Sequence, residues 1–163
     1  MISLDFRKSG MKPVVTSCLL LVLSACGGSE GNTSTPPSTP SAETINGISV
    51  PPPPPSAMSD ATIAGIDTDH NGVRDDIDRK IATEFGSNSA EYANALAHAQ
   101  TLQAAIATPS AERSAAHIAK IVCLSPEMLA RTSPVTLSTV NTGARREAYA
   151  EAFAGATIED CAK

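Results

Sequence analysis

The distribution of the prolines limits most strongly what this chain can fold into. Eight of the 12 prolines lie between Pro36 and Pro55, five of them consecutively from Pro51 to Pro55. Gly, Ser and Thr fill most of the other positions of residues 27–59, so this longer segment has too little apolar surface to offset the entropy of ordering it. We expect a stiff polyproline II rod over Pro51–Pro55 and a flexible, disordered tether over the rest of residues 26–59. A proline-rich ligand for a partner domain is the alternative interpretation.

The residues ahead of this segment predict a removable export signal. Lys12 is followed by an apolar run of 11 residues, Pro13 to Leu23. The run is too short to cross a bilayer, which takes about 20 helical residues, but it has the length of the apolar region of a signal peptide. The residues that end it, Leu23-Ser24-Ala25-Cys26, resemble the lipobox of bacterial lipoproteins.

The lipobox resemblance implies that the chain is cut before Cys26 and that Cys26 carries the lipid. Residues 1–25 would then be the signal peptide, and Met11, which Lys12 follows, is its expected start. Gly27, rather than Asp, after the cysteine resembles the sorting signal of outer-membrane lipoproteins. We therefore expect a lipid-anchored protein of the bacterial cell envelope, most simply at the outer membrane. A transmembrane anchor and an ordinary cleaved signal are the alternatives.

The charge of the exported product restricts its partners. Counted from Cys26, the chain has 9 Lys or Arg and 16 Asp or Glu, a net charge of −7. An acidic protein has no electrostatic reason to bind nucleic acid, and anionic lipid head groups would repel it. We expect contact with the membrane through the lipid anchor and not through charge.

An acidic stretch after the tether predicts a metal site. Within 12 residues, oxygen-bearing side chains fall at positions 1, 3, 5, 9 and 12, and Gly72 at position 6 permits the left-handed backbone of a tight bend. Ca²⁺ binds about six to eight oxygens, and a backbone carbonyl at position 7 would add one. The expected ligands are Asp67, Asp69, Asn71, Val73, Asp75 and Asp78.

Over about a dozen residues this stretch resembles the calcium loops of EF-hands, thrombospondin type 3 repeats and dockerins. Two positions depart from the pattern: Asn71 removes one charge while keeping an oxygen, and Asp78 stands where a typical EF-hand has Glu, which weakens bidentate closure. Mg²⁺ fits less well because it prefers octahedral sites that retain water. The alternative is an acidic start of a helix, in which Asp75, Asp76 and Asp78 favour the positive end of the helix dipole.

The residues that follow the tether, 60–163, predict an all-α domain, a small bundle of four or five helices preceded by the calcium loop. Stop and start signals divide this part of the chain. Apolar residues recur at helical spacing, as in Tyr92, Leu96 and Ala99. The expected helices are 77–85, 89–107, 109–124 started by Thr108-Pro109, a short turn 126–131, and a last helix from Thr142 to about Ala154, with a loop over 132–141.

Three histidines and an arginine pair are further candidates for binding residues. His98 and His117 have polar neighbours at helical spacing, so we expect solvent-exposed side chains and no metal site. His70, at position 4 of the acidic loop, would point outward. Arg145-Arg146 is typical of a solvated helix start, with an anion or partner site as the alternative.

Two cysteines remain in the mature chain for a disulfide. Cys18 would leave with the signal and Cys26 would be acylated, so Cys123 and Cys161 form an even pair in an oxidising compartment. We expect a disulfide between Cys123 and Cys161, and two free thiols are the alternative.

The sequence contains no motif that identifies a reaction. It lacks a nucleophile elbow, a phosphate-binding loop, a zinc signature and a paired-acid motif, and no small-molecule substrate is evident. We expect a non-enzymatic module that binds another protein of the envelope. A periplasmic immunity or inhibitor lipoprotein is one alternative, and an enzyme, such as a hydrolase that uses the bound cation, is another.

Overall fold

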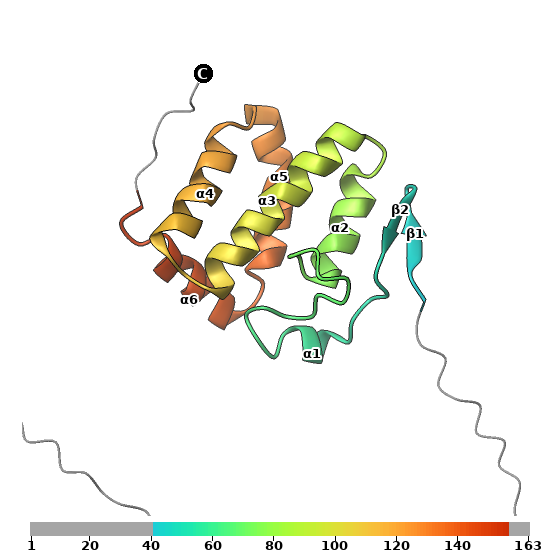
Figure 1. Cartoon of the computed structure of the whole chain (residues 1–163), viewed down its shortest axis with the longest axis horizontal. Helices are drawn as coiled ribbons and strands as arrows, with labels where there is room; N and C mark the ends of the chain where they lie inside the picture. The colour runs from blue at the N-terminus through green and yellow to red at the C-terminus, as the bar shows by residue number, and fades with distance from the viewer. Residues whose placement is uncertain (1–40, 157–163) are drawn as a thin grey trace, which may run out of the picture. The chain divides into compact units, whose positions relative to one another are not determined.

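The structure of the chain is a computed structural model that describes residues 41–156 (Figure 1). The chain divides into two units, Met1–Pro37 and Ser38–Lys163, and all described residues belong to the second. The expected signal peptide, Cys26 and Cys161 lie outside the described residues, so the lipid anchor and the disulfide remain predictions. The described part contains six helices and a two-stranded sheet, which confirms a mostly helical small domain.

The elements follow one another with short connections. They are β1 (Glu43–Ile45), β2 (Ile48–Val50), α1 (Ser56–Ser59), α2 (Asp75–Phe85), α3 (Ser89–Ala107), α4 (Ala111–Val122), α5 (Pro126–Thr139) and α6 (Gly143–Ala152). Among residues 41–156, none of the helices is both long and apolar enough to cross a membrane.

Side-chain caps begin four of the helices. Asn88 accepts hydrogen bonds from the backbone N–H groups of residues 90 and 91 and starts α3, and Ser125 and Thr142 cap α5 and α6 in the same way. These three starts are confirmed. The predicted start of α4 is wrong by two residues: Ser110, not Thr108, accepts from the N–H of Arg113, and α4 begins at Ala111.

Helix α5 is longer than predicted and corrects the loop expected over 132–141. It continues through Pro134 to Thr139. The reason is burial: Thr132, Val135 and Thr139, at helical spacing, are fully covered. The hydroxyls of Thr132 and Thr139 donate to carbonyls one turn earlier in the same helix, so both polar groups enter the core already bonded.

Helix α3 is the centre of the domain and contacts α2, α4, α5 and α6; Figure 1 shows it between α2 and α4. Its small residues Ala95 and Ala99 let neighbouring helices approach closely. One core cluster joins α2, α3 and α5, and a second joins α3 and α6 around Leu102 and Ile106. The fully buried apolar side chains of the first are Val73, Ile77, Ile81, Phe85, Ala95, Ala99 and Val135.

The β1–β2 hairpin corrects the expectation of a disordered tether up to residue 59. Asn46 and Gly47 both have positive φ, +50° and +82°, as the tight turn of a two-residue hairpin requires. The Asn46 amide donates to the carbonyls of Ala82 and Thr83, near the end of α2. Val50 is 1% exposed. The packed domain therefore begins at the hairpin, ahead of the predicted boundary at Asp60.

The proline run is also part of the packed domain. Pro51 is buried, and its carbonyl accepts a hydrogen bond from Arg79 of α2 at 3.0 Å. Arg79 also forms an ion pair with Glu43 of β1 at 2.8 Å. Pro55 ends the run with extended backbone and leads directly into α1. The run thus connects the hairpin to α1 along the body of the protein.

Candidate metal centre

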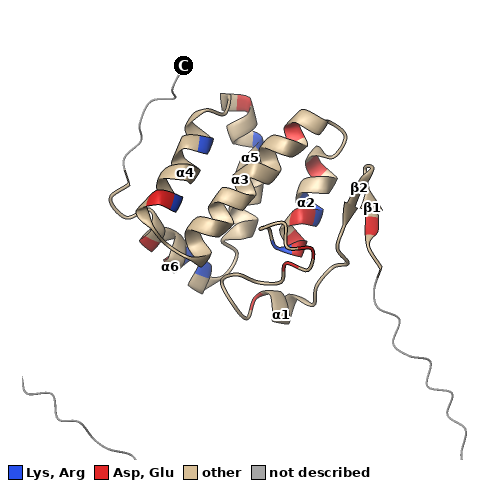
Figure 2. Ribbon diagram, viewed as in Figure 1, with Lys and Arg blue, Asp and Glu red and all other residues tan. Residues whose placement is uncertain are grey.

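The acidic loop closes just ahead of α2. The backbone N–H of Asp75 donates to the carbonyl of Ile66 at 2.8 Å, so residues 67–74 form a closed turn. Gly72 has φ +87° and His70 has φ +59°, which supply the two left-handed positions of the bend. His70 is exposed, as predicted. Figure 2 shows the acidic residues of the loop and of the start of α2 gathered in one region.

Three carboxylates converge in this turn. Asp67, Asp69 and Asp75 each place one oxygen within 4.8 Å of the others. Such a cluster could hold a metal ion, because carboxylate oxygens are ligands for hard cations. The sequence prediction of these three residues as neighbours is therefore confirmed by the geometry.

Backbone N–H groups fix the first carboxylate. Asp67 accepts from the N–H of Asn71 at 3.1 Å and from that of Gly72 at 3.0 Å. Thr68 holds Asp75 in the same manner, with its N–H at 2.8 Å and its hydroxyl at 2.6 Å. A carboxylate has about four lone-pair sites, so both groups retain oxygen lone pairs for a further ligand.

Asp78, also a predicted ligand, is not one of the three converging carboxylates but is joined to them through Asn71. It is 2% exposed, and one oxygen accepts from the side-chain amide of Asn71 at 2.7 Å. The other oxygen, Oδ1, has no hydrogen-bond partner among the described residues. A buried carboxylate oxygen without a partner is costly, and a bound cation would remove that cost.

Burial and three neighbouring carboxylates determine the electrostatic environment of Asp78. Burial raises the pKa of Asp78 to about 6, the Asn71 hydrogen bond opposes this, and the charges of Asp69, Asp75 and Asp67 raise it further. Partial burial and the neighbouring carboxylates also raise the pKa of Asp69. The four carboxylates therefore repel one another in the metal-free state.

The other two predicted ligands have clear structural places. Asn71 bridges the cluster, since its side chain contacts both Asp69 and Asp78, while its own oxygen accepts from the N–H of Val73. The Val73 side chain is buried in the core cluster of α2. That packing anchors position 7 of the loop, and the role of the Val73 carbonyl as a ligand remains a prediction.

Two long side chains attach the loop to the helical body. Gln100 of α3 donates to the carbonyl of Asn71 at 2.8 Å. Arg74, with a fully buried side chain, pairs with Asp76 and donates to the carbonyls of Ser138 and Thr139 at the end of α5. The loop is therefore fixed from two sides before any metal binds.

Arg145 corrects the expectation of a solvated arginine pair. Its side chain is fully buried, whereas Arg146 is exposed. The guanidinium donates to five oxygens, most of them in the segment that leads into the acidic loop. They belong to Ser59, Asp60, Thr62, Ile63 and Asn141.

His98 and His117 are also corrections, because both are buried at 2% exposure. His98 lies one turn from Ala95 and one turn from Leu102, both fully covered, so it belongs to the buried face of α3 and not to the polar face predicted for it. That spacing was a usable signal. The buried arginines offered none, because the acceptors of Arg145 are more than 80 residues away apart from Asn141.

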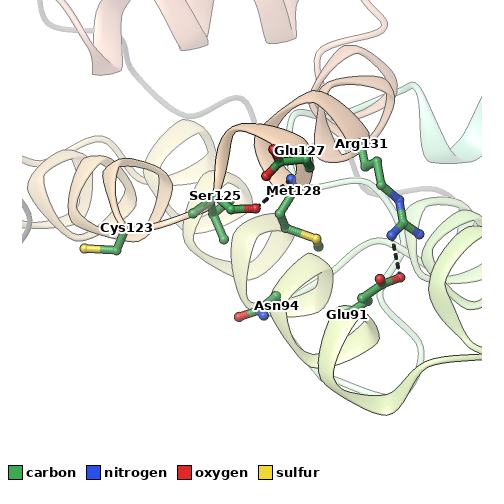
Figure 3. Close-up of a pocket in the computed structure, with 8 residues that line it drawn as sticks. Glu91, Asn94, Cys123, Ser125, Glu127, Met128 and Arg131 are labelled. Atoms are coloured by element: carbon green, nitrogen blue, oxygen red, sulfur yellow. Dashed lines mark hydrogen bonds and ion pairs between the residues drawn. The ribbon is translucent and has the colours of Figure 1, made fainter.

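A surface hollow of about 340 Å³ lies near the start of α3, beside the connection between α4 and α5 (Figure 3). Glu91 and Arg131 form an ion pair of 2.6 Å there, and Arg131 also lies over the ring of Phe85 at 5.0 Å. None of the loop residues lines this hollow. Its lining residues are Glu91, Asn94, Cys123, Leu124, Ser125, Glu127, Met128 and Arg131.

The chain matches no family model, no curated protein and no solved structure.

Proposed function

We propose that residues 67–78 bind one Ca²⁺ and that this ion stabilises the domain. The observation that carries the proposal is the convergence of three carboxylates beside the unpartnered, buried oxygen of Asp78. Asp67, Asp69, Asn71 and Asp75 would supply side-chain oxygens, Asp78 would close the site, and Val73 would add its carbonyl. Ca²⁺ tolerates such irregular oxygen sets better than Mg²⁺ does.

Thermal melting of the protein in excess Ca²⁺ and in EGTA tests the proposal. Linkage predicts about 4 kcal/mol of stabilisation when free Ca²⁺ is about 1,000 times its Kd, so the melting temperature should rise by roughly 15 °C or more. Identical midpoints in Ca²⁺ and in EGTA would contradict the proposal.

Asp78→Asn gives a sharper test because its two effects have opposite signs. Removing one of four mutually repelling charges should raise the melting temperature of the metal-free protein. Losing a ligand should shrink the additional rise caused by Ca²⁺. The matched control is Glu147→Gln, which removes a carboxylate from an exposed position of α6 and should leave the Ca²⁺ response unchanged.

Tyr92 offers a direct optical test of the location of the ion. The charges of Asp78 and Asp69 contribute to a raised pKa of its phenol, after the larger effect of burial, so the ring lies near the loop. The chain has two tyrosines and no tryptophan. Tb³⁺ in place of Ca²⁺ should luminesce on tyrosine excitation in the Tyr149→Phe variant and lose most of that signal in Tyr92→Phe. The reverse pattern would place the ion elsewhere.

For the whole chain we propose a lipid-anchored envelope protein whose domain binds another protein and catalyses no reaction. The sequence around Cys26 supports the anchor. The closure of the loop by the hydrogen bond from Asp75 N–H to the Ile66 carbonyl, together with the lack of a reaction motif in the sequence, supports binding over catalysis. The metal then has a structural part.

Detergent partition of the full chain expressed in a bacterium tests the anchor. The wild type should enter the detergent phase, and Cys26→Ala should lose that property and remain unprocessed. Cys18→Ala, a change inside the expected signal, is the matched control and should partition like the wild type. Equal partition of both variants would refute lipidation at Cys26.

Capture of envelope proteins by the purified chain tests the binding role. The proposal expects a partner that is retained in Ca²⁺ and reduced in EGTA. Recovery of a toxin whose activity the chain blocks would indicate an immunity lipoprotein, and turnover of a small molecule by the purified chain would contradict the non-enzymatic role.

A further inference from the structure

Helix α4 is attached to the domain by an unusually polar face. The two α4 residues that are fully covered are Ser114 and His117. Ile118, Ile121 and Val122 are only half-buried, and Ala115 is exposed. The hydrophobic effect therefore contributes less to docking of α4 than it does for α2 or α3.

The polar attachment is a contact between two imidazoles. The rings of His98 on α3 and His117 on α4 have centroids 5.1 Å apart. His98 Nε2 lies 2.8 Å from the hydroxyl of Thr136 on α5. The ring of His117 also packs on Phe153, just after α6, at 5.4 Å. Four parts of the bundle thus meet at this pair.

The two rings form their hydrogen bonds with threonine hydroxyls, which are neutral partners. The hydroxyl of Thr101 lies within 3.1 Å of two backbone carbonyls of its own helix and 2.9 Å from His117 Nδ1. Its single proton goes to a carbonyl, so the hydroxyl accepts from Nδ1–H of His117. His98 Nδ1 is buried and has no hydrogen-bond partner among the described residues.

Among the described contacts of the two rings there is no negative charge that could compensate a bound proton. Within residues 41–156, neither ring has a carboxylate among its hydrogen-bond or ion-pair partners, and the residues that α5 and the end of α6 place against the rings, Thr136 and Phe153, do not titrate. Burial lowers the pKa of each imidazole to about 4. Lys120 on α4 lowers that of His98 further, and His98 does the same to His117.

We propose that the His98–His117 contact is an acid-sensitive latch, which holds α4 on α3 at neutral pH and releases α4 when either imidazole binds a proton. Release hydrates the charged ring and separates it from Lys120. It also uncovers the half-buried face of Ile118, Ile121 and Val122. The latch is independent of the metal site, and it adds a conformational response to acid that the calcium proposal does not require.

The direction and size of the pH response follow from the imidazole pKa in the docked and in the released state of α4. The imidazole pKa is about 4 in the docked helix and about 6.5 when released, so the docked state loses stability as pH falls from about 6.5 to about 4. Between pH 7.5 and pH 5 the opening constant should rise roughly 30-fold for one imidazole, and by the square of that factor if both act independently.

Two measurements on the full chain in saturating Ca²⁺ test the latch. Histidine NMR should show that His98 and His117 remain neutral in the folded protein as the pH is lowered to 5. Hydrogen exchange, corrected for the intrinsic effect of pH, should show roughly 30-fold or greater loss of protection in α4 at pH 5. Protection of α2 should be retained. Titration of both buried rings near 6.5 in the folded protein would overturn the proposal.

Variants separate the latch from the loop carboxylates. The double variant His98→Gln and His117→Asn keeps hydrogen-bonding groups near Nε2 and Nδ1 and should abolish the acid-induced loss of protection in α4. His70→Asn, which suits the left-handed backbone there, should retain it. Acid-induced opening in the double variant would assign the response to other groups and refute the latch. If that variant does not fold, the NMR titration of the wild type decides.

Discussion

Arg145 offers the largest stability effect that the structure predicts for a single side chain. Its buried guanidinium donates to five oxygens, including Asp60 Oδ1 at 2.9 Å and the carbonyl of Thr62 at 2.8 Å. Arg145→Met would remove the donor from the buried carbonyl of Ser59 and from four partly exposed oxygens, those of Asp60, Thr62, Ile63 and Asn141. A charge-assisted hydrogen bond contributes about 1.5–3 kcal/mol, and these bonds are not additive. The nearby charge of Arg74 opposes that of Arg145 and offsets part of the gain.

The expected loss for Arg145→Met is therefore about 3 kcal/mol, the size of one or two charge-assisted hydrogen bonds, because the 40% exposed Asp60 is rehydrated when the arginine is removed. Arg145→Lys should recover less than half of it, because an ammonium has three donors and cannot match the planar fork. Since whole domains are stable by only about 5–15 kcal/mol, the variant should be close to unfolding at 37 °C.

Urea unfolding followed by far-ultraviolet circular dichroism, in excess Ca²⁺, measures these losses. The neighbouring Arg146 is the control: it is exposed and donates to the carbonyl of Asn141 at 3.0 Å. Arg146→Met should cost less than about 0.5 kcal/mol. If the two arginine variants differ by less than about 1 kcal/mol, the argument that the buried donors organise the segment ahead of the loop is wrong.

Three further substitutions test local features by thermal melting. Gly65→Ala should lower the free energy of unfolding by at least about 2 kcal/mol, because Gly65 has φ +69° and an added Cβ would clash with Cδ of Arg74. Gly47→Ala is the control: Gly47 has φ +82° but open space around it, so the loss should be smaller. Equal losses in the two variants would contradict the steric argument. Pro134→Ala should stabilise by about 1–3 kcal/mol, since the proline stands inside α5; a loss would show that the ring contributes packing. Asn88→Ala should cost about 1 kcal/mol, and no change would contradict its role as the cap of α3.

Local signals predicted the helical body well where a single residue determined the boundary. The sequence predicted α3 with its observed ends, Ser89 and Ala107, because Asn88 is a strong cap and Thr108 is followed by a proline. Two cap residues so close together, Thr108 and Ser110, made the start of α4 ambiguous. Helix α5 failed for a different reason: Pro134 and several threonines predict a break, and only tertiary burial overrides them.

In the candidate site, too, local features were predictable from the sequence and contacts with distant residues were not. Glycine and carboxylate spacing predicted the loop, because all its groups come from 12 consecutive residues. The attachments through Arg74, Gln100 and Arg145 depend on helices that are far away in the sequence, so spacing could not reveal them. The hairpin carried a usable local signal, Asn46-Gly47, which is typical of a tight turn, but the surrounding prolines and polar residues obscured it.

The hairpin also determines how the domain would respond to mechanical load. Glu43 pairs with Val50, so the chain enters and leaves the hairpin at the same end. Tension on the chain ahead of Glu43 would therefore break the hydrogen bonds between β1 and β2 one pair after another, rather than all at once. Complete opening of residues 43–50 would lengthen the connection by roughly 20 Å while α2 to α6 remain folded. The hairpin would thus unfold first under load, and the acidic loop and the helices that follow it would remain folded while it extends.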